Sequence, residues 1–288
     1  MSTAAWLGAL ALDIVAGEPP APAHPVVLAG RAIEALDQRA PRTVAAGALV
    51  VGLPALGAIA LAKVLPWPLR LPLLKSSFAL RELLDATARV ERALETGSLA
   101  EARRAAARIV GRPTADLSAQ HVASAAIESV SENLCDSYVA PLFWYGVAGL
   151  PGALAYRVVN TADAMIGHRT PRHELVGRIA ARADDALGYV PARITALTLA
   201  LCAPVVQGSV AASLRAIRDD GGRTASPNSG LSMAAAAGAL GVTLEKVSHH
   251  RLGTGRSPAA ADIGRARTLV LASAVLVTAA YALVRRRR

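Results

Sequence analysis

The chain has 288 residues, of which 53% are hydrophobic, and its mean hydropathy of +0.38 is too apolar for an ordinary soluble enzyme. Its net charge is +10, but aromatic residues make up only 3% of the chain. A nucleic-acid-binding face would combine basic side chains with aromatic side chains that stack on bases. Because the arginines are spread through every loop, the excess positive charge indicates contact with membrane lipid, not with nucleic acid.

Four long apolar windows predict helices that cross a membrane. They lie at 43–65, 138–156, 194–214 and 268–284. Lys63 is the only charged residue in any of them. Each window approaches the roughly 20 residues that span a bilayer core, and the segment 4–17 is a weaker candidate because Asp13 interrupts it. We therefore expect an all-α, polytopic helical integral membrane protein in which residues 1–288 form a single catalytic domain.

Shorter helices are expected between the apolar windows. A helix at 28–39 follows a proline-rich loop, and amphipathic, interfacial helices are expected at 72–96 and 99–110. With only four spans, the polar loops would lie on different sides of the membrane. Extra or re-entrant helices within 118–135 or 231–244 would bring the loops to one side. The charge pattern is compatible with each of these topologies.

The four arginines at 285–288 directly follow the last apolar window. Basic residues next to a span favour the cytoplasmic side of the membrane. The expected location is therefore the inner, cytoplasmic membrane of the cell, with several spans and a cytoplasmic C-terminus.

Acidic residues recur at helical spacing before the second window. Glu128, Glu132 and Asp136 are four residues apart, with Asn133 beside them. Acids on one helix face repel one another unless cations intervene, and Mg²⁺ binds through one or two carboxylates plus substrate phosphates. The alternative is an exposed acidic face, or pairing with arginines from another loop.

Two further polar groups flank apolar runs. Asn160 and Asp163 lie three residues apart, one turn after Arg157, and could instead form an interfacial cap. Asp184 and Asp185 follow Arg182, and arginine can hold a phosphate or carboxylate through two hydrogen bonds. The alternative for this second group is an internal ion pair.

Three other segments could hold anions. Ser226, Asn228 and Ser229 precede a predicted helix start, where backbone N–H groups favour anions. Lys75 is followed by two serines and is placed well for a phosphate, while Arg193 precedes the third window. The pair at 249–250 is interpreted as two surface histidines. The phosphate-binding pattern G-x-x-x-x-G-K-[ST] does not occur, so any nucleotide site is of another kind.

In their order along the chain, these segments resemble the adenosylcobinamide-phosphate synthase family of cobalamin biosynthesis, whose members are polytopic membrane proteins. The resemblance covers nearly the whole chain. It rests on residues 24–30, 128–133 with Asp136, 140–143, 149–152, 156–157, 160–167, 184–185, 191–193, 226–230, 236–242 and 245–246. It departs at Glu18, where an aspartate is expected.

The resemblance implies an ATP-dependent amide bond between adenosylcobyric acid and aminopropanol phosphate, giving adenosylcobinamide phosphate, with ATP and Mg²⁺ required. We expect catalytic roles for Glu128, Glu132, Asp163, Asp184 and Asp185. We expect Glu132, Asp136 and Asp163 to bind metal. Substrate and phosphate contacts are expected from His24, Lys75, Asn133, Arg157, Asn160, Arg182, Arg193, Ser226, Asn228, Ser229 and Lys246.

Other functions fit some of the same features. Acids and arginines at membrane depth also mark transporters, and a scaffold that holds other corrinoid-pathway enzymes needs no catalytic acids. A lipid-type phosphotransferase would need a denser aspartate-rich helix than residues 184–185 supply.

Overall fold

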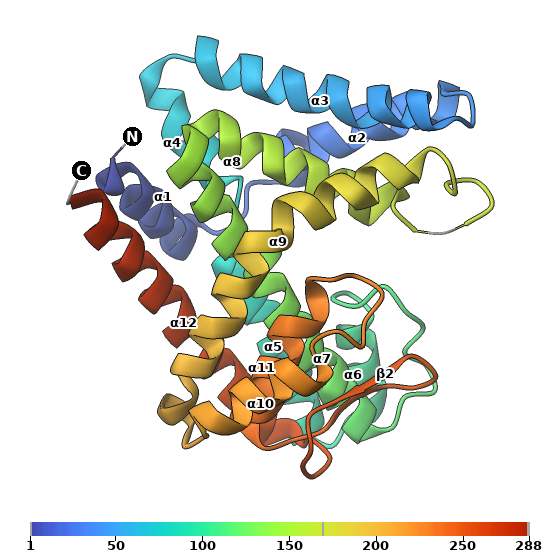
Figure 1. Cartoon of the computed structure of the whole chain (residues 1–288), viewed down its shortest axis with the longest axis vertical. Coiled ribbons are helices and arrows are strands. Elements are labelled where there is room, and N and C mark those ends of the chain that lie inside the picture. Colours follow the sequence, from blue (N-terminus) through green and yellow to red (C-terminus); the bar gives the residue numbers. More distant parts are fainter. Residues whose placement is uncertain (1, 169, 287–288) are drawn as a thin grey trace. The chain divides into compact units, whose positions relative to one another are not determined.

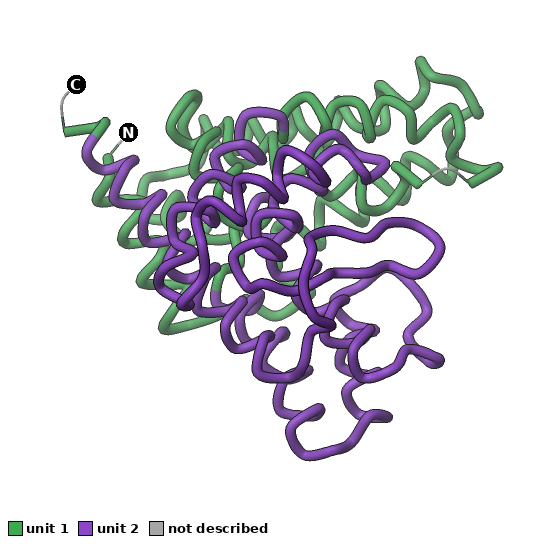
Figure 2. Tube along the Cα trace, turned by 60° about the horizontal axis from the view of Figure 1, so that its bottom comes forward, with its two compact units in different colours: residues 1–80, 136–188, 284–288 green, residues 81–135, 189–283 purple. Residues whose placement is uncertain are grey.

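The computed structural model describes residues 2–168 and 170–286, so Arg287 and Arg288 of the basic tail lie outside the described residues (Figure 1). Helices dominate the structure, which confirms the all-α prediction. The chain divides into two compact units, each assembled from separate stretches of sequence (Figure 2). Unit 1 comprises residues 1–80, 136–188 and 284–288, and unit 2 comprises residues 81–135 and 189–283. The single catalytic domain stays a prediction.

Unit 1 is a helical assembly around an aliphatic core. Its helices are α1 (Thr3–Ala16), α2 (Pro25–Arg39), α3 (Val44–Val64), α4 (Trp67–Lys75), α8 (Ala140–Ile166) and the first part of α9 (Gly177–Leu201). Helices α2, α3 and α8 pack against one another (Figure 1). Ile33, Val50 and Val158 are buried at their meeting point. Gly47 lets α3 approach the segment that precedes α9, because a Cβ there would overlap the carbonyl of Val176.

Three helices of the described chain are long and apolar enough to cross a membrane. They are Val44–Val64, the helical run Ala119–Ile166, and α12 (Ala260–Arg286). The first and last match the windows expected at 43–65 and 268–284. Little of α3 is buried within the chain, and Leu49, Leu53 and Leu56 are exposed. An apolar helix with exposed leucines has the surface that lipid would cover, as expected of a polytopic membrane protein. Helix α1 matches the weaker candidate at 4–17, but it has only 14 residues.

The window at 138–156 is not a straight helix. Residues Cys135–Val139 form a π-helical turn, and α8 is kinked at Gly149, whose φ of 71° is outside the helical range. Glycine adopts this conformation without the steric cost that a Cβ would add. Pro151 follows near the start of the second segment, a position where proline's missing N–H is tolerated.

The window at 194–214 does not form the expected spanning helix. Helix α9 ends at Leu201, a 3₁₀ turn covers Ala203–Val206, and Gln207 adopts a left-handed conformation. Helix α10 (Val210–Asp220) then begins, and the Ser209 hydroxyl accepts a hydrogen bond from the Ala212 N–H. A serine cap of this kind favours a new helix start. Mean hydropathy averages over the whole window, so it detects neither the end of α9 nor the start of α10.

The helices of unit 2 are α5 (Leu80–Glu95), α6 (Leu99–Ala106), α7 (Ala119–Leu134), α10, α11 (Ser229–Leu240), α12 and the second part of α9. Helices α7 and α11 form the buried centre. Gly238 lets α10 approach α11, because a Cβ there would lie 2.6 Å from the Ala212 carbonyl.

Several predicted boundaries change. The helix expected at 72–96 is two helices, α4 and α5, separated where the hydroxyls of Ser76 and Ser77 donate to carbonyls of the preceding turn. The helix expected at 99–110 ends at Ala106, whereas 28–39 lies within α2. The helices considered within 118–135 and 231–244 are present as α7 and α11.

The sequence pattern missed a short antiparallel hairpin in unit 2. Strand β1 (Leu244–Lys246) pairs with β2 (His250–Leu252), with Leu244 opposite Leu252. Both of these leucines are fully buried. Strands of three residues are too short for their alternation to stand out from a loop.

Candidate functional site

Unit 1 brings together four aspartates from three separate segments of the sequence. Asp136 lies on the π-helical turn, Asp163 on α8, and Asp184 and Asp185 on α9. Gly167 lies directly against the Asp163 carboxylate, which a Cβ at this position would overlap. The two polar groups at 160–167 and 182–185, identified separately in the sequence, therefore meet in one place.

A chain of hydrogen bonds connects these acids. The Tyr156 hydroxyl donates to the Asp136 carboxylate at 3.3 Å. Arg157 donates to the Asp136 backbone carbonyl at 3.4 Å and to the Asn160 side-chain oxygen at 3.1 Å. The Asn160 amide in turn donates to Asp184 at 3.2 Å. Arg157 and Asn160 thus hold the cluster in position, and Tyr156, which belongs to one of the motifs behind the resemblance but had no predicted role, is a further member.

The Asp184 carboxyl group is crowded by like charges. Burial, together with the negative charges of Asp136, Asp163 and Asp185, raises the pKa of Asp184 to about 8, even though the Asn160 hydrogen bond opposes the shift. A carboxyl group with such a pKa exchanges its proton near neutral pH, as a general acid or base must. Perturbed groups of this kind are concentrated at functional sites.

A polar cavity of about 420 Å³ adjoins Asp185 and Gly167. Its other charged or titratable lining residues are His168, His173, Glu174, Arg178 and Arg182. Guanidinium groups bind phosphate and carboxylate groups, so the cavity presents anion-binding side chains beside the aspartates. Arg182, which the sequence analysis expects to contact a phosphate group, lines this cavity, and its role stays a prediction.

His24 and Lys75 lie in unit 1 but are paired with acids. The Lys75 ammonium, which is 3% exposed, lies 2.5 Å from Glu18 and 3.1 Å from Asp13. His24 contacts the other Glu18 oxygen at 2.7 Å and caps α2 by accepting from the Val26 N–H. Burial would raise the pKa of Glu18, but the hydrogen bonds from His24 and Lys75 hold it below its usual value. The predicted substrate contacts of His24 and Lys75 stay predictions.

Glu128 lies in unit 2 and is surrounded by compensating groups. The Ser124 hydroxyl donates to it at 2.8 Å, and its other oxygen lies 3.5 Å from Arg112 and 3.4 Å from His250. The interpretation of residues 249–250 as a surface pair is wrong for His250, whose side chain is only 10% exposed. The hairpin causes this burial, because the Glu245 N–H donates to Ser124 and anchors β1 to α7.

Among the other predicted residues of unit 2, Arg193 contacts the loop that contains Ser226, Asn228 and Ser229. Arg193 stacks on the Tyr189 ring and donates to the Asn228 side chain at 3.4 Å. In the loop before α11, the Asn228 N–H donates to Ser226. Ser229 donates to Thr224, which the pattern missed. Glu132 and Asn133 lie on α7, where Asn133 donates to a backbone carbonyl one turn earlier, and Lys246 ends β1.

The family model described as "CobD/Cbib protein" matches residues 6–275. The chain belongs to the CobD/Cbib family. This confirms the resemblance inferred from the sequence motifs.

Curated CobD/Cbib relatives cover nearly the whole chain. A "Probable cobalamin biosynthesis protein CobD" of Pyrococcus furiosus is 43% identical over 270 residues, covering 90% of each chain. A "Cobalamin biosynthesis protein CobD" of Mycobacterium tuberculosis is 41% identical over 296 residues, covering 96% of this chain and 94% of the relative. The protein of that name in Dehalococcoides mccartyi is 37% identical over 264 residues, covering 86% and 85%. No solved structure gives a significant match.

The aspartate cluster of unit 1 offers carboxylate oxygens, the ligands that Mg²⁺ prefers. Within residues 2–168 and 170–286, no group of three or more His, Cys, Asp or Glu side chains is arranged to hold a metal ion. Mg²⁺ needs only one or two protein carboxylates when substrate phosphates supply other ligands. The cluster of Asp136, Asp163, Asp184 and Asp185 in this CobD/Cbib chain fits that requirement because the repulsion among its carboxylates would be relieved by a cation. The metal roles of Glu132, Asp136 and Asp163 stay predictions.

Proposed function

We propose that this CobD/Cbib chain acts in cobalamin biosynthesis. On this proposal it forms an ATP-dependent amide bond between a carboxylate of adenosylcobyric acid and the amine of aminopropanol phosphate. The observation that supports it most directly is the aspartate cluster beside an arginine-lined cavity. The names of the curated relatives support the pathway, and the reaction rests on the family resemblance.

The chemistry requires activation of a poor electrophile. Transfer of the terminal phosphoryl group of ATP to the substrate carboxylate forms an acyl phosphate and releases ADP. Attack of the amine nitrogen on the acyl carbon then forms the C–N bond and releases phosphate, and the amine gives up a proton. The net change is one amide formed and one ATP hydrolysed to ADP and phosphate.

The residues of unit 1 match these tasks. Asp184, with a pKa of about 8, would accept the amine proton near neutral pH. Arg178 and Arg182 would hold phosphate or carboxylate groups in the cavity. Asp136 and Asp163 would hold Mg²⁺, which when bound neutralises phosphate charge. Arg157 and Asn160 would keep the acids in position.

In this proposal the reaction takes place at the cell membrane, with the C-terminus in the cytoplasm. The three candidate spanning helices support a membrane location. Arg285 and Arg286, which end α12, support the orientation through the preference of basic residues for the cytoplasmic side.

The direct test is mass spectrometry of a reaction with detergent-purified protein. The mixture contains adenosylcobyric acid, aminopropanol phosphate, Mg²⁺ and ATP, with an ATP-free mixture as control. We expect a product at the mass of the two substrates minus water, formed with an equal amount of ADP. Intact substrates after incubation with folded protein would contradict the proposal, and vesicle uptake of the corrinoid would then test transport.

A further inference from the structure

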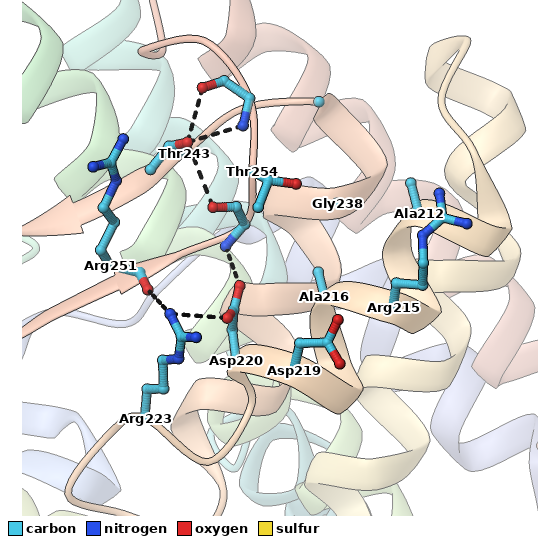
Figure 3. Close-up of a pocket in the computed structure, with 13 residues that line it drawn as sticks. Ala212, Arg215, Ala216, Asp219, Asp220, Arg223, Gly238, Thr243, Arg251 and Thr254 are labelled. Carbon is cyan, nitrogen blue, oxygen red and sulfur yellow. Dashed lines mark hydrogen bonds and ion pairs between the residues drawn. The ribbon is translucent and has the colours of Figure 1, made fainter.

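Unit 2 contains a separate cavity, of about 710 Å³, that the proposed reaction does not use (Figure 3). Helix α10, the end of α11 and the segment after β2 form its walls. Its charged lining residues are Arg215, Asp219, Asp220, Arg223 and Arg251. None of them belongs to a motif noted in the sequence.

The negative charges of the two aspartates in this cavity are already paired with arginines. Buried Asp220 accepts from the Gly253 N–H at 2.6 Å and pairs with Arg223 at 3.1 Å. Asp219 pairs with Arg218 at 2.7 Å, an arginine outside the lining. With Arg218 counted, guanidinium groups outnumber carboxylates by two around the cavity.

Arg215 and Arg251 supply this excess positive charge. Within the described part of the chain, neither side chain donates a hydrogen bond to another residue, although Arg215 attracts the nearby Asp219 carboxylate. In the view of Figure 3, Arg251 and Arg215 flank Thr254. Both arginines are exposed and can reorient toward a ligand without breaking a hydrogen bond.

Residues 253–255, which also line the cavity, are held in place by hydrogen bonds. The Thr243 hydroxyl accepts from the Gly255 N–H at 3.0 Å and donates to the Gly255 carbonyl at 2.9 Å. Gly253 has a φ of 78°, and a Cβ there would lie 2.6 Å from the Val242 carbonyl. The backbone around Thr254 is thus ordered before any ligand binds, which lowers the entropic cost of binding.

We propose that this cavity binds a small phosphate-bearing ligand, such as a phosphomonoester or a polyphosphate group, through Arg215 and Arg251. Arginine pairs with phosphate through two parallel, charge-assisted hydrogen bonds, and the cavity is much larger than one phosphate ion requires. The proposal concerns binding alone, so it does not depend on the amide-forming reaction.

The test is calorimetric titration of pyrophosphate into the full-length protein in an uncharged detergent. EDTA is present throughout, so that metal-dependent binding at the aspartate cluster does not contribute. We expect saturable binding that the double variant Arg215→Gln with Arg251→Gln weakens by about tenfold or more, since two charge-assisted contacts are lost. Arg251→Lys alone, which keeps the charge but not the paired geometry, should have an intermediate effect.

The matched control is Arg104→Gln on α6. Arg104 lies in the same unit, is 72% exposed and does not line the cavity. Its substitution should leave binding unchanged. Equal weakening by Arg104→Gln would overturn the proposal in favour of diffuse attraction by net charge, as would absence of binding by folded wild type. Displacement of pyrophosphate by phosphatidylglycerol but not by inorganic phosphate would assign the cavity to a lipid headgroup and overturn the small-ligand assignment.

Discussion

The aspartate cluster of unit 1 and Glu128 of unit 2 have opposite surroundings. Asp184 is close to three other carboxylates, and the hydrogen bond it receives comes from a neutral amide, that of Asn160. Glu128 has a hydroxyl donor, a guanidinium group and an imidazole within 3.5 Å. A carboxyl group crowded by like charges, as Asp184 is, is poised to bind a proton or a cation.

These surroundings indicate two different roles for a buried acid, one in activity and one in stability. Uncompensated charge lowers the stability of the folded protein, and such costs persist where a site needs them for function. A compensated buried charge destabilises the protein mainly when one partner is removed. We therefore expect the aspartate cluster of unit 1 to matter most for activity, and the Glu128 cluster to matter most for folding.

The largest expected effect is on activity in unit 1. Asp184→Asn should lower the rate of amide formation by about 100-fold or more, because it removes the proposed general base. Product formation, measured by mass spectrometry, checks this. Glu101→Gln is the matched control, since Glu101 is an exposed acid whose ion pair with Arg104 is loose, at 3.8 Å. Full activity of Asp184→Asn would contradict the proposed role.

Next in size is the effect of Glu128→Gln on stability. The substitution leaves the Arg112 and His250 side chains without a carboxylate in a buried site. Removing one partner of a buried ion pair costs on the order of 3 kcal/mol, so the thermal unfolding temperature should fall. An unchanged unfolding temperature together with lost activity would instead support the catalytic role predicted for Glu128 from the sequence.

A smaller effect is expected on the pH dependence of stability. Because the pKa of Asp184 is about 8 when folded and its ordinary value is 3.8, the folded state binds more protons between these values. The free energy of unfolding should therefore fall as pH rises from about 5 to 8, by up to about 1.4 kcal/mol per pH unit. Thermal unfolding in EDTA should show this slope in wild type and a shallower one in Asp184→Asn. Equal slopes would show that Asp184 does not titrate in this range.

The smallest effect concerns an acid outside both clusters, in unit 1. Burial would raise the pKa of Asp37, but hydrogen bonds from Arg42, His173 and Arg172 lower it below its usual value. Asp37→Asn should cost about 1 kcal/mol at neutral pH, since both arginines are largely exposed and screened by solvent. The difference from wild type should disappear as pH falls through the pKa of Asp37. Chemical denaturation at pH 7 and pH 3 measures both values, and a cost that persists at pH 3 would point to packing.

Features encoded over a few neighbouring residues were predictable. Hydropathy located α3 and most of α12, and the spacing within 160–167 and 182–185 identified the polar groups that form the aspartate cluster. Helix periodicity places side chains three or four residues apart on one face, so the approximate position of Asp163 relative to Asn160 follows from the chain alone. The family followed from many such motifs in order.

Features that depend on packing between distant segments were not predictable. His250 meets Glu128 across 122 positions because a short hairpin docks on α7. The excess of arginine around the unit 2 cavity arises from α10 and β2 together. Residues this far apart are brought together by the burial of apolar surfaces and by hydrogen bonds such as that from Glu245 to Ser124. The spacing of residues along the chain does not encode those interactions. The partners of each acid are therefore known only from the folded structure.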